Sequence, residues 1–239
     1  MRTVNITLQG KGGVGKSFVA SLLSQHHQQK GRSVVCIDTD PVNNTLAGYA
    51  AFGARRLRIA DGSKVSERNF DQMMEWILGE DADFVIDNGA SCFLPLSNYL
   101  VENGAVPMIV EAGKAVVVHT VITGGQALID TLHGLDQLAR QMPEPAKIVV
   151  WLNEYFGDIE KDGKSFEEMA VYQAHQHRVA GVVRLPRQNP DTFGKDLEAM
   201  LDRKLTFGEV KASAEFSLMA KQRLTMIGRS IFQQMDLVV

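Results

Sequence analysis

Short apolar runs alternate along this chain with longer stretches in which apolar residues recur every three or four positions. Continuous apolar runs of this length are typical of strands that are buried on both faces of a parallel sheet. We expect such strands at residues 4–8, 33–37, 83–87, 116–122, 147–153 and 180–185, with a further short strand at 57–60. The helix-like stretches predict helices that begin near residues 18, 69, 93, 107, 125, 189 and 216. The pattern therefore predicts an α/β protein.

Length and composition favour an ordinary globular protein. The 239 residues are enough for one sizeable α/β domain over residues 1–239. The net charge of −3 gives no overall attraction to nucleic acid, so any DNA contact would need a local patch. The most basic stretch, residues 55–68, is the candidate, although a solvated charged face explains it more simply. With two cysteines, no secretory leader and no apolar run near ~20 residues, we expect a soluble, cytoplasmic protein with reduced thiols.

Two features favour a structural role over a binding role. His119 lies inside the apolar run 116–122, where a hydrogen-bonded core histidine is more common than a ligand. From residue 216 onward, apolar residues recur at helical intervals: Phe216, Met219, Leu224, Ile227, Ile231 and Met235. The basic residues of this stretch are offset by Glu215 and Asp236, whereas anionic lipid would require a basic face. We therefore expect this helix to pack against the domain, with no stable membrane association.

The sequence GKGGVGKS at residues 10–17 lies between the first predicted strand and the first predicted helix. This spacing, G-x-x-x-x-G-K-S, is typical of a phosphate-binding loop. Its glycines allow consecutive backbone N–H groups to face one anion, and the following helix adds its N-terminal dipole. Lys16 would reach the β- and γ-phosphates of a nucleotide, and the Ser17 hydroxyl would hold Mg²⁺. The phosphate cradle would be formed by Gly12, Gly13, Val14, Gly15, Lys16, Ser17 and Phe18.

Carboxylates follow two of the predicted strands. Asp38 and Asp40 come at the end of the run 33–37, and Asp87 ends the run 83–87. Open α/β sheets bind their ligands at the carboxyl ends of strands. An apolar strand that ends in one acid is also typical of a carboxylate placed beside a metal ion, so Asp87 is a candidate for Mg²⁺. An ordinary acidic turn is the alternative for Asp38 and Asp40.

The sequence KGGVGKS at residues 11–17 resembles the phosphate-loop motif of the deviant phosphate-loop ATPases of the ParA/MinD family. Matching motifs run in order from residue 4 to about residue 186. The resemblance implies a doubly wound, mainly parallel sheet with helices on both faces, the P-loop NTPase fold. It also implies an ATPase that forms a homodimer on binding ATP and Mg²⁺.

The same resemblance implies roles for individual residues. Lys11 would cross an ATP-bound dimer to touch the partner's nucleotide, Asp38 would lie near Mg²⁺, and Asp40 would orient the attacking water. Asn153 would recognise the adenine edge and Pro186 would pack on the base. Lys11, Lys16 and Asp40 are thus the expected catalytic residues, and Ser17, Asp38 and Asp87 the expected metal ligands.

Three positions depart from the family pattern. Phe18 stands where the family usually has Ser or Thr for the α-phosphate, Val42 replaces a usual Gln, and Asn88 follows Asp87 where Pro or Gly is more common. Within the family, residues 118–126 and 216–222 look like the TraL-type proteins of conjugative plasmids.

The resemblance implies a molecular switch: ATP closes a dimer, slow hydrolysis opens it, and one state binds partners better. Its task would be to position a DNA or protein partner in plasmid conjugal transfer or partitioning. One alternative is an iron–sulfur electron carrier like the nitrogenase iron protein, with Cys36 and Cys92 as ligands. Another is a small-molecule ligase on the same scaffold, against which Lys11 argues.

Overall fold

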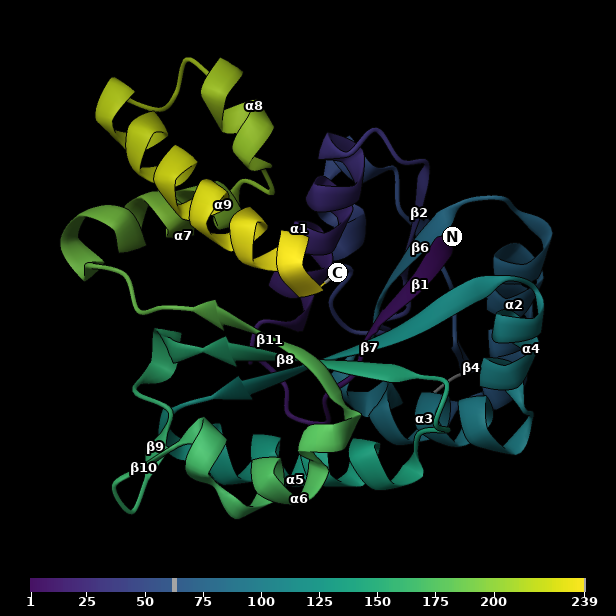
Figure 1. The fold of residues 1–239 in the computed structure, drawn as a ribbon. Helices are drawn as coiled ribbons and strands as arrows, with labels where there is room; N and C mark the ends of the chain where they lie inside the picture. The colour runs from purple at the N-terminus through teal and green to yellow at the C-terminus, as the bar shows by residue number, and fades with distance from the viewer. Residues whose placement is uncertain (62–63, 239) are drawn as a thin grey trace.

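A parallel sheet forms the centre of the protein, seen here in a computed structural model that describes residues 1–61 and 64–238. Within this part of the chain, seven strands pair in parallel (Figure 1). Their order across the sheet is β11 (Val179–Leu185), β8 (Lys147–Asn153), β7 (Lys114–Thr123), β1 (Arg2–Thr7), β6 (Asp83–Asp87), β2 (Val34–Asp38) and β3 (Arg55–Arg56). The predicted parallel sheet is confirmed.

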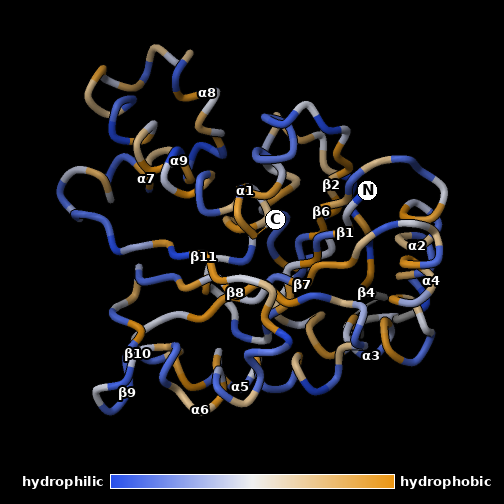
Figure 2. Tube along the Cα trace, in the orientation of Figure 1, coloured by the Kyte–Doolittle hydropathy of each residue, from blue (hydrophilic) through white to orange (hydrophobic). Residues whose placement is uncertain are grey.

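Helices cover both faces of the sheet, as the sequence predicted (Figure 1). One face carries α1 (Lys16–Gln29), α7 (Lys195–Asp202), α8 (Phe207–Ala212) and α9 (Leu218–Val238). The other face carries α2 (Phe70–Gly79), α3 (Phe93–Glu102), α4 (Ala105–Glu111), α5 (Leu128–Gln141) and α6 (Ala170–His175). Hydrophobic residues gather along the central strands, whereas the peripheral connections are mostly hydrophilic (Figure 2).

Among the described residues, two short antiparallel strand pairs lie outside the main sheet. They are β4 (Ala60–Asp61) with β5 (Lys64–Val65), and β9 (Glu160–Lys161) with β10 (Lys164–Ser165). The short strand expected at 57–60 is therefore wrong in its bounds, because pairing occurs at Arg55–Arg56 and again from Ala60. Residues 57–59 instead run between the two pairings, with Leu57 and Ile59 buried in the core.

The last helix, α9, packs on the sheet as predicted. Leu224, Ile227, Ile231 and Met235 are buried in the core on the α1 side. Met219 does not belong to this buried stripe, because its side chain is 58% exposed. In the parts of the chain that the structure describes, no helix has the length and apolarity needed to cross a membrane.

A chain of buried hydrogen bonds crosses the sheet on the face that α1 covers. Trp151 Nε1 on β8 donates to His119 Nδ1 on β7 over 3.0 Å, and His119 Nε2 lies 3.0 Å from Asn5 Oδ1 on β1. Asn5 Nδ2 in turn lies 3.1 Å from Nε2 of His27, near the end of α1. The indole can only donate, so His119 Nδ1 accepts and its Nε2 donates. His119 is therefore the satisfied core histidine that the sequence predicted.

Candidate functional site

The loop between β1 and α1 lies at the carboxyl edge of the sheet and carries the predicted glycines. Gly13 and Gly15 have φ angles of 74° and 105°, a region that residues with a side chain rarely adopt. Gly15 directly precedes α1, so the first N–H groups of the helix face the loop. A Cβ on Gly15 would also lie 2.9 Å from Asn153 Nδ2. Both the backbone conformation and this close approach thus require glycine here.

Lys16 turns back into the loop that precedes it. Its Nζ donates to the carbonyl oxygen of Lys11 over 2.9 Å, and its side chain is buried. Burial lowers the pKa of Lys16, while the nearby carboxylates of Asp87 and Asp40 act in the opposite direction. The lysine is thus held inside the loop, with two acids close to it.

Asp38 and Asp87 are neighbours at the ends of adjacent strands, paired in the β2–β6 register. Asp38 accepts backbone N–H groups on both oxygens, from Asp40 at 3.1 Å and from Ala47 at 2.9 Å. Burial is the main cause that raises the pKa of Asp38. These contacts fix the Asp38 carboxylate in place.

Asp87 is the most deeply buried acid of this edge. Its Oδ1 accepts from Thr7 Oγ1 at 3.2 Å, whereas its Oδ2 has no hydrogen-bond partner among the described residues. Burial raises the pKa of Asp87 to about 7, although the Ser17 hydroxyl and the Lys16 ammonium both lower it. A buried carboxylate oxygen beside a hydroxyl is an oxygen donor set of the kind that Mg²⁺ prefers.

Asp40 lies in the turn after β2 and rests against the segment after β6. Its Oδ1 accepts from the backbone N–H groups of Val42 at 2.9 Å and Asn43 at 3.2 Å. A Cβ on Gly89 would lie 2.7 Å from this oxygen, so only glycine allows the approach. A second contact joins the same two segments, because Thr39 Oγ1 donates to Asn88 Oδ1 over 2.8 Å.

Lys11 stands on the outer side of the loop. Its Nζ lies 2.8 Å from Asp130 Oδ2 on α5 of the same chain, and both side chains are about half exposed. The sequence did not predict this contact.

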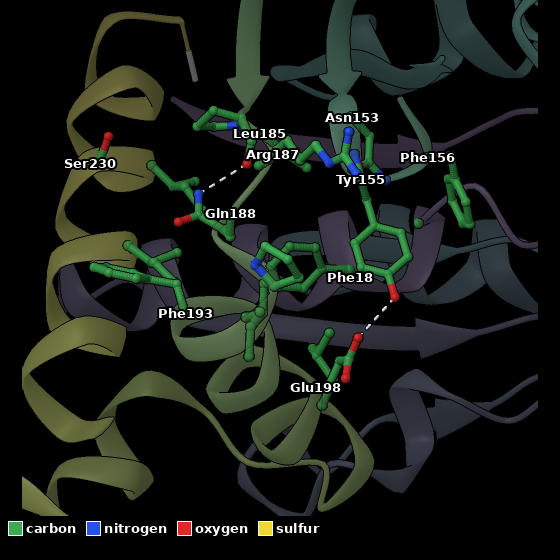
Figure 3. Close-up of a pocket in the computed structure, with 18 of the residues that line it drawn as sticks. Phe18, Asn153, Tyr155, Phe156, Leu185, Arg187, Gln188, Phe193, Glu198 and Ser230 are labelled. Atoms are coloured by element: carbon green, nitrogen blue, oxygen red, sulfur yellow. Dashed lines mark hydrogen bonds between the residues drawn. The ribbon is translucent and has the colours of Figure 1, made fainter. Parts of the chain in front are cut away.

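A cavity of about 670 Å³ opens beside the loop (Figure 3). Gly13, Gly15 and Phe18 form one side, and Asn153 and Pro186 lie at the ends of β8 and β11. Asn153 Nδ2 donates to the Val14 carbonyl over 2.9 Å, and its Oδ1 accepts from Tyr155 N at 3.2 Å. Asn153 therefore ties the loop to β8 while keeping one N–H and one lone pair for a ligand.

Other lining residues were not anticipated. Tyr155 OH donates to Glu198 Oε1 over 3.0 Å, which joins the end of β8 to α7 across the cavity (Figure 3). Arg187 and Phe193 also line the cavity. Tyr155 and Arg187 each lie two residues beyond a strand end, which is a usable signal in the sequence. Phe193 and Glu198 reach the site only because the chain folds back after Pro186, through a π-helical turn (Pro190–Gly194) into α7.

The structure thus places the predicted site residues in two adjoining groups. The loop, Lys16, Ser17, Asp38, Asp40 and Asp87 meet at the ends of β1, β2 and β6, and Phe18, Asn153 and Pro186 line the cavity beside them. Among the described residues, no cluster of three or more His, Cys, Asp or Glu side chains is arranged to bind a metal alone. At nucleotide-binding sites, Mg²⁺ is usually held by one or two carboxylates, and water and substrate phosphate oxygens supply its other ligands.

Other candidate residues lie elsewhere. Cys36 and Cys92 are both buried, against Ser24 and the Thr39 carbonyl. The His175 side chain is only 12% exposed, and its Nε2 lies 2.7 Å from Asp136 Oδ1. In the basic stretch, the exposed Arg56, Arg58 and Arg68 line a hollow together with Asp71 and Glu75, so its charge is mixed. Lys64 also belongs to the predicted basic stretch 55–68, but its side chain lies outside the described ones.

Comparison with known proteins shows which sequences and folds this chain resembles. The sequence profile of the CobQ/CobB/MinD/ParA nucleotide binding domain matches residues 6–225. Two proteins of Escherichia coli named Protein TraL are 47% and 45% identical to the chain over 236 residues, covering 99% of it and 98% of each relative. The MinC:MinD cell division protein complex of Aquifex aeolicus contains a similar structure, with a TM-score of 0.54 and 14% identity. That match covers 97% of this chain and 96% of the other, and at this identity it shows the fold alone.

Proposed function

The chain belongs to the CobQ/CobB/MinD/ParA family of nucleotide-binding domains, and we propose that it is an ATP-dependent dimerising switch. The observation that carries the proposal is the meeting of Lys16, Asp40 and Asp87 at one loop. A lysine inside a glycine loop, with acids at two adjacent strand ends, has the parts required for phosphoryl transfer to water. Residues 1–239 would act as one such domain.

The proposed binding mode places the triphosphate over residues 12–18. Lys16 would give up the Lys11 carbonyl and donate to the β- and γ-phosphates, which are stronger acceptors because they are charged. The nucleoside would enter the adjoining cavity, where Asn153 offers its remaining donor and acceptor to adenine and Pro186 packs on the base.

The residues present fit a magnesium ion. Asp87 has a buried oxygen without a partner in the described structure, and the Ser17 hydroxyl lies beside it. Asp38, held next to Asp87 in the register, would complete the acidic side of the site. A bound Mg²⁺ would neutralise charge on the phosphates as it develops. A cation would stabilise the ionised forms of Asp38 and Asp87, because burial of their negative charges is otherwise unfavourable.

Asp40 is the proposed group that orients the attacking water. It is less buried than Asp38 and Asp87, and it lies close enough to Lys16 for its charge to raise the pKa of that lysine. Its contacts with Val42, Asn43 and Gly89 would hold the carboxylate in position, so that one oxygen remains to accept a proton or to direct water.

We further propose that ATP joins two copies of the chain, with Lys11 reaching the partner's nucleotide. The high identity to the TraL proteins favours a task in plasmid conjugal transfer or partitioning, in which the dimer positions a protein or DNA partner. The alternative of an iron–sulfur carrier gains no support, since both cysteines are buried within the chain. We do not expect ATP-dependent membrane binding, because α9 packs on the domain.

Titration calorimetry with Mg-ATP, combined with phosphate release, tests this proposal. Lys16→Ala should weaken ATP binding by at least about tenfold, because it removes the cation of the loop. Asp40→Ala should bind ATP and fail to hydrolyse it, and light scattering should show it accumulating as a dimer. Asp40→Asn is the matched control, since it keeps an acceptor for Val42 and Asn43 but has no charge.

The result that would contradict the proposal is equally direct. If Lys16→Ala binds Mg-ATP as tightly as the unmodified protein, the loop is not the nucleotide site. If Asp40→Asn turns over normally while Asp40→Ala does not, Asp40 maintains the turn instead of orienting water.

A further inference from the structure

Phe18 stands at the junction of the phosphate loop and the cavity. It is the third residue of α1, two positions after Lys16, and its half-buried side chain contributes to the cavity wall. In the close-up it lies in the middle of the site, between Tyr155 on one side and Phe193 on the other (Figure 3). Phe18 therefore lines the cavity together with Gly13 and Gly15 of the loop.

The chemistry of this wall suits a nucleoside better than a phosphate. A phenyl ring has no N–H or O–H to donate, and the negative face of its π-system disfavours an anion. The neighbouring wall is also largely apolar, with Leu185, Pro186, Phe193 and Leu197, while Arg187 supplies a cation elsewhere in the lining. Glu198, a carboxylate in the cavity, already accepts a hydrogen bond from Tyr155. Pockets of about 300–1,000 Å³ are typical of small-molecule sites, and 670 Å³ falls within that range.

We propose that the Phe18 ring packs against the nucleoside of the bound nucleotide, so that part of the affinity comes from the base rather than from the α-phosphate. This inference rests on the proposed nucleotide-binding function. A hydroxyl at position 18 would hydrogen-bond a phosphate and act alike on any polyphosphate. An aromatic ring acts only on ligands that carry a base, because every base offers a π-face for stacking.

The test compares two probes in calorimetry at fixed Mg²⁺: ATP and inorganic tripolyphosphate, which has the phosphates without the nucleoside. The measured quantity is the ratio of their affinities. Phe18→Leu should lower the ATP affinity about tenfold and leave the tripolyphosphate affinity unchanged, as expected for one lost stacking contact. Phe18→Thr should lower the ratio of ATP affinity to tripolyphosphate affinity by a similar factor. The stacking contact with ATP is lost, and the new hydroxyl would strengthen the binding of both probes alike.

Phe232→Leu is the matched control. Phe232 is a half-buried phenylalanine of α9 that packs against His26 and Phe207 and does not line the cavity. Its variant should keep the unmodified ratio. The inference is overturned if Phe18→Leu leaves the ratio unchanged, or if Phe232→Leu lowers it as much. If the unmodified protein binds neither ATP nor tripolyphosphate, the proposed nucleotide-binding function itself is wrong. A failure of the inference alone would leave ATP binding intact, with an unchanged affinity ratio in Phe18→Leu.

Discussion

Replacing His27 by glutamine should make folding less sensitive to acid. His27 lies buried near the end of α1, and its Nε2 accepts from Asn5 Nδ2 in the hydrogen-bond chain that crosses the sheet. Burial lowers the pKa of His27 to about 4, compared with an ordinary value of 6.5. A glutamine side chain can present a carbonyl oxygen to Asn5, so His27→Gln removes the titration and keeps an acceptor.

The sign and size of the effect follow from proton linkage. The unfolded chain takes up a proton on His27 as the pH falls through 6.5, whereas the folded protein stays neutral until about pH 4. The stability from neutral His27 is therefore complete above pH 6.5 and is lost progressively on acidification towards pH 4. Integration from about pH 7 to about pH 5 gives a loss of about 2 kcal/mol in the free energy of unfolding.

Urea unfolding at both pH values measures this loss. Asp87 titrates in the opposite sense in the same range, since its pKa is raised to about 7, so the pH dependence must be compared between variants. His27→Gln should reduce the pH-dependent loss by about 2 kcal/mol. His177→Gln should not reduce it, because the His177 side chain is exposed in the folded protein and meets water in both states. Equal losses in unmodified protein and His27→Gln would refute the reasoning.

Two further predictions concern the site. Gly89→Ala should displace the Asp40 carboxylate, because the added Cβ would lie 2.7 Å from Oδ1. Phosphate release should fall at least about tenfold while ATP affinity is preserved. Normal turnover in this variant would disprove the importance of the contact. Lys11→Ala should bind ATP but remain monomeric in light scattering, whereas Asp130→Asn, which frees Lys11, should raise the dimer fraction. A loss of ATP binding equal to that of Lys16→Ala would show that Lys11 acts only within its own chain.

The sheet could be predicted because its strands are continuously apolar. Residues 83–87 and 147–153 form strands with the expected bounds, since burial on both faces leaves few other arrangements for such runs. The β9–β10 hairpin and α8 were missed because they are short and lack a strong apolar period. Local signals were present, however. Ser165 and Glu168 form a capping box at the helical turn after β10, and Thr206 and Glu209 form one at the start of α8 itself.

The candidate site was predictable where it is local in sequence. A glycine loop needs only a few consecutive residues, and an acid at the end of an apolar run can be located from the run itself. Contacts between distant segments were not predictable in this way. Lys11 meets Asp130 across 119 positions, and Tyr155 meets Glu198 across 43. Such pairs depend on how α5 and α7 pack on the sheet, which no local pattern specifies.

The internal partners of the two lysines explain why ATP binding and dimerisation would respond differently. Lys16 contacts a neutral carbonyl, so exchanging it for a charged phosphate would strengthen the hydrogen bond in a buried place. Lys11 contacts a carboxylate, and moving to a partner's phosphate would exchange one anion for another at an exposed position. Exposed ion pairs contribute little net stability, so giving up Asp130 would cost little and most of the attraction to the partner's phosphate would favour the proposed dimer. We infer that Lys16 would favour nucleotide binding within each chain, whereas the proposed dimer would depend on Lys11 and on the partner's nucleotide and would open when that nucleotide is hydrolysed.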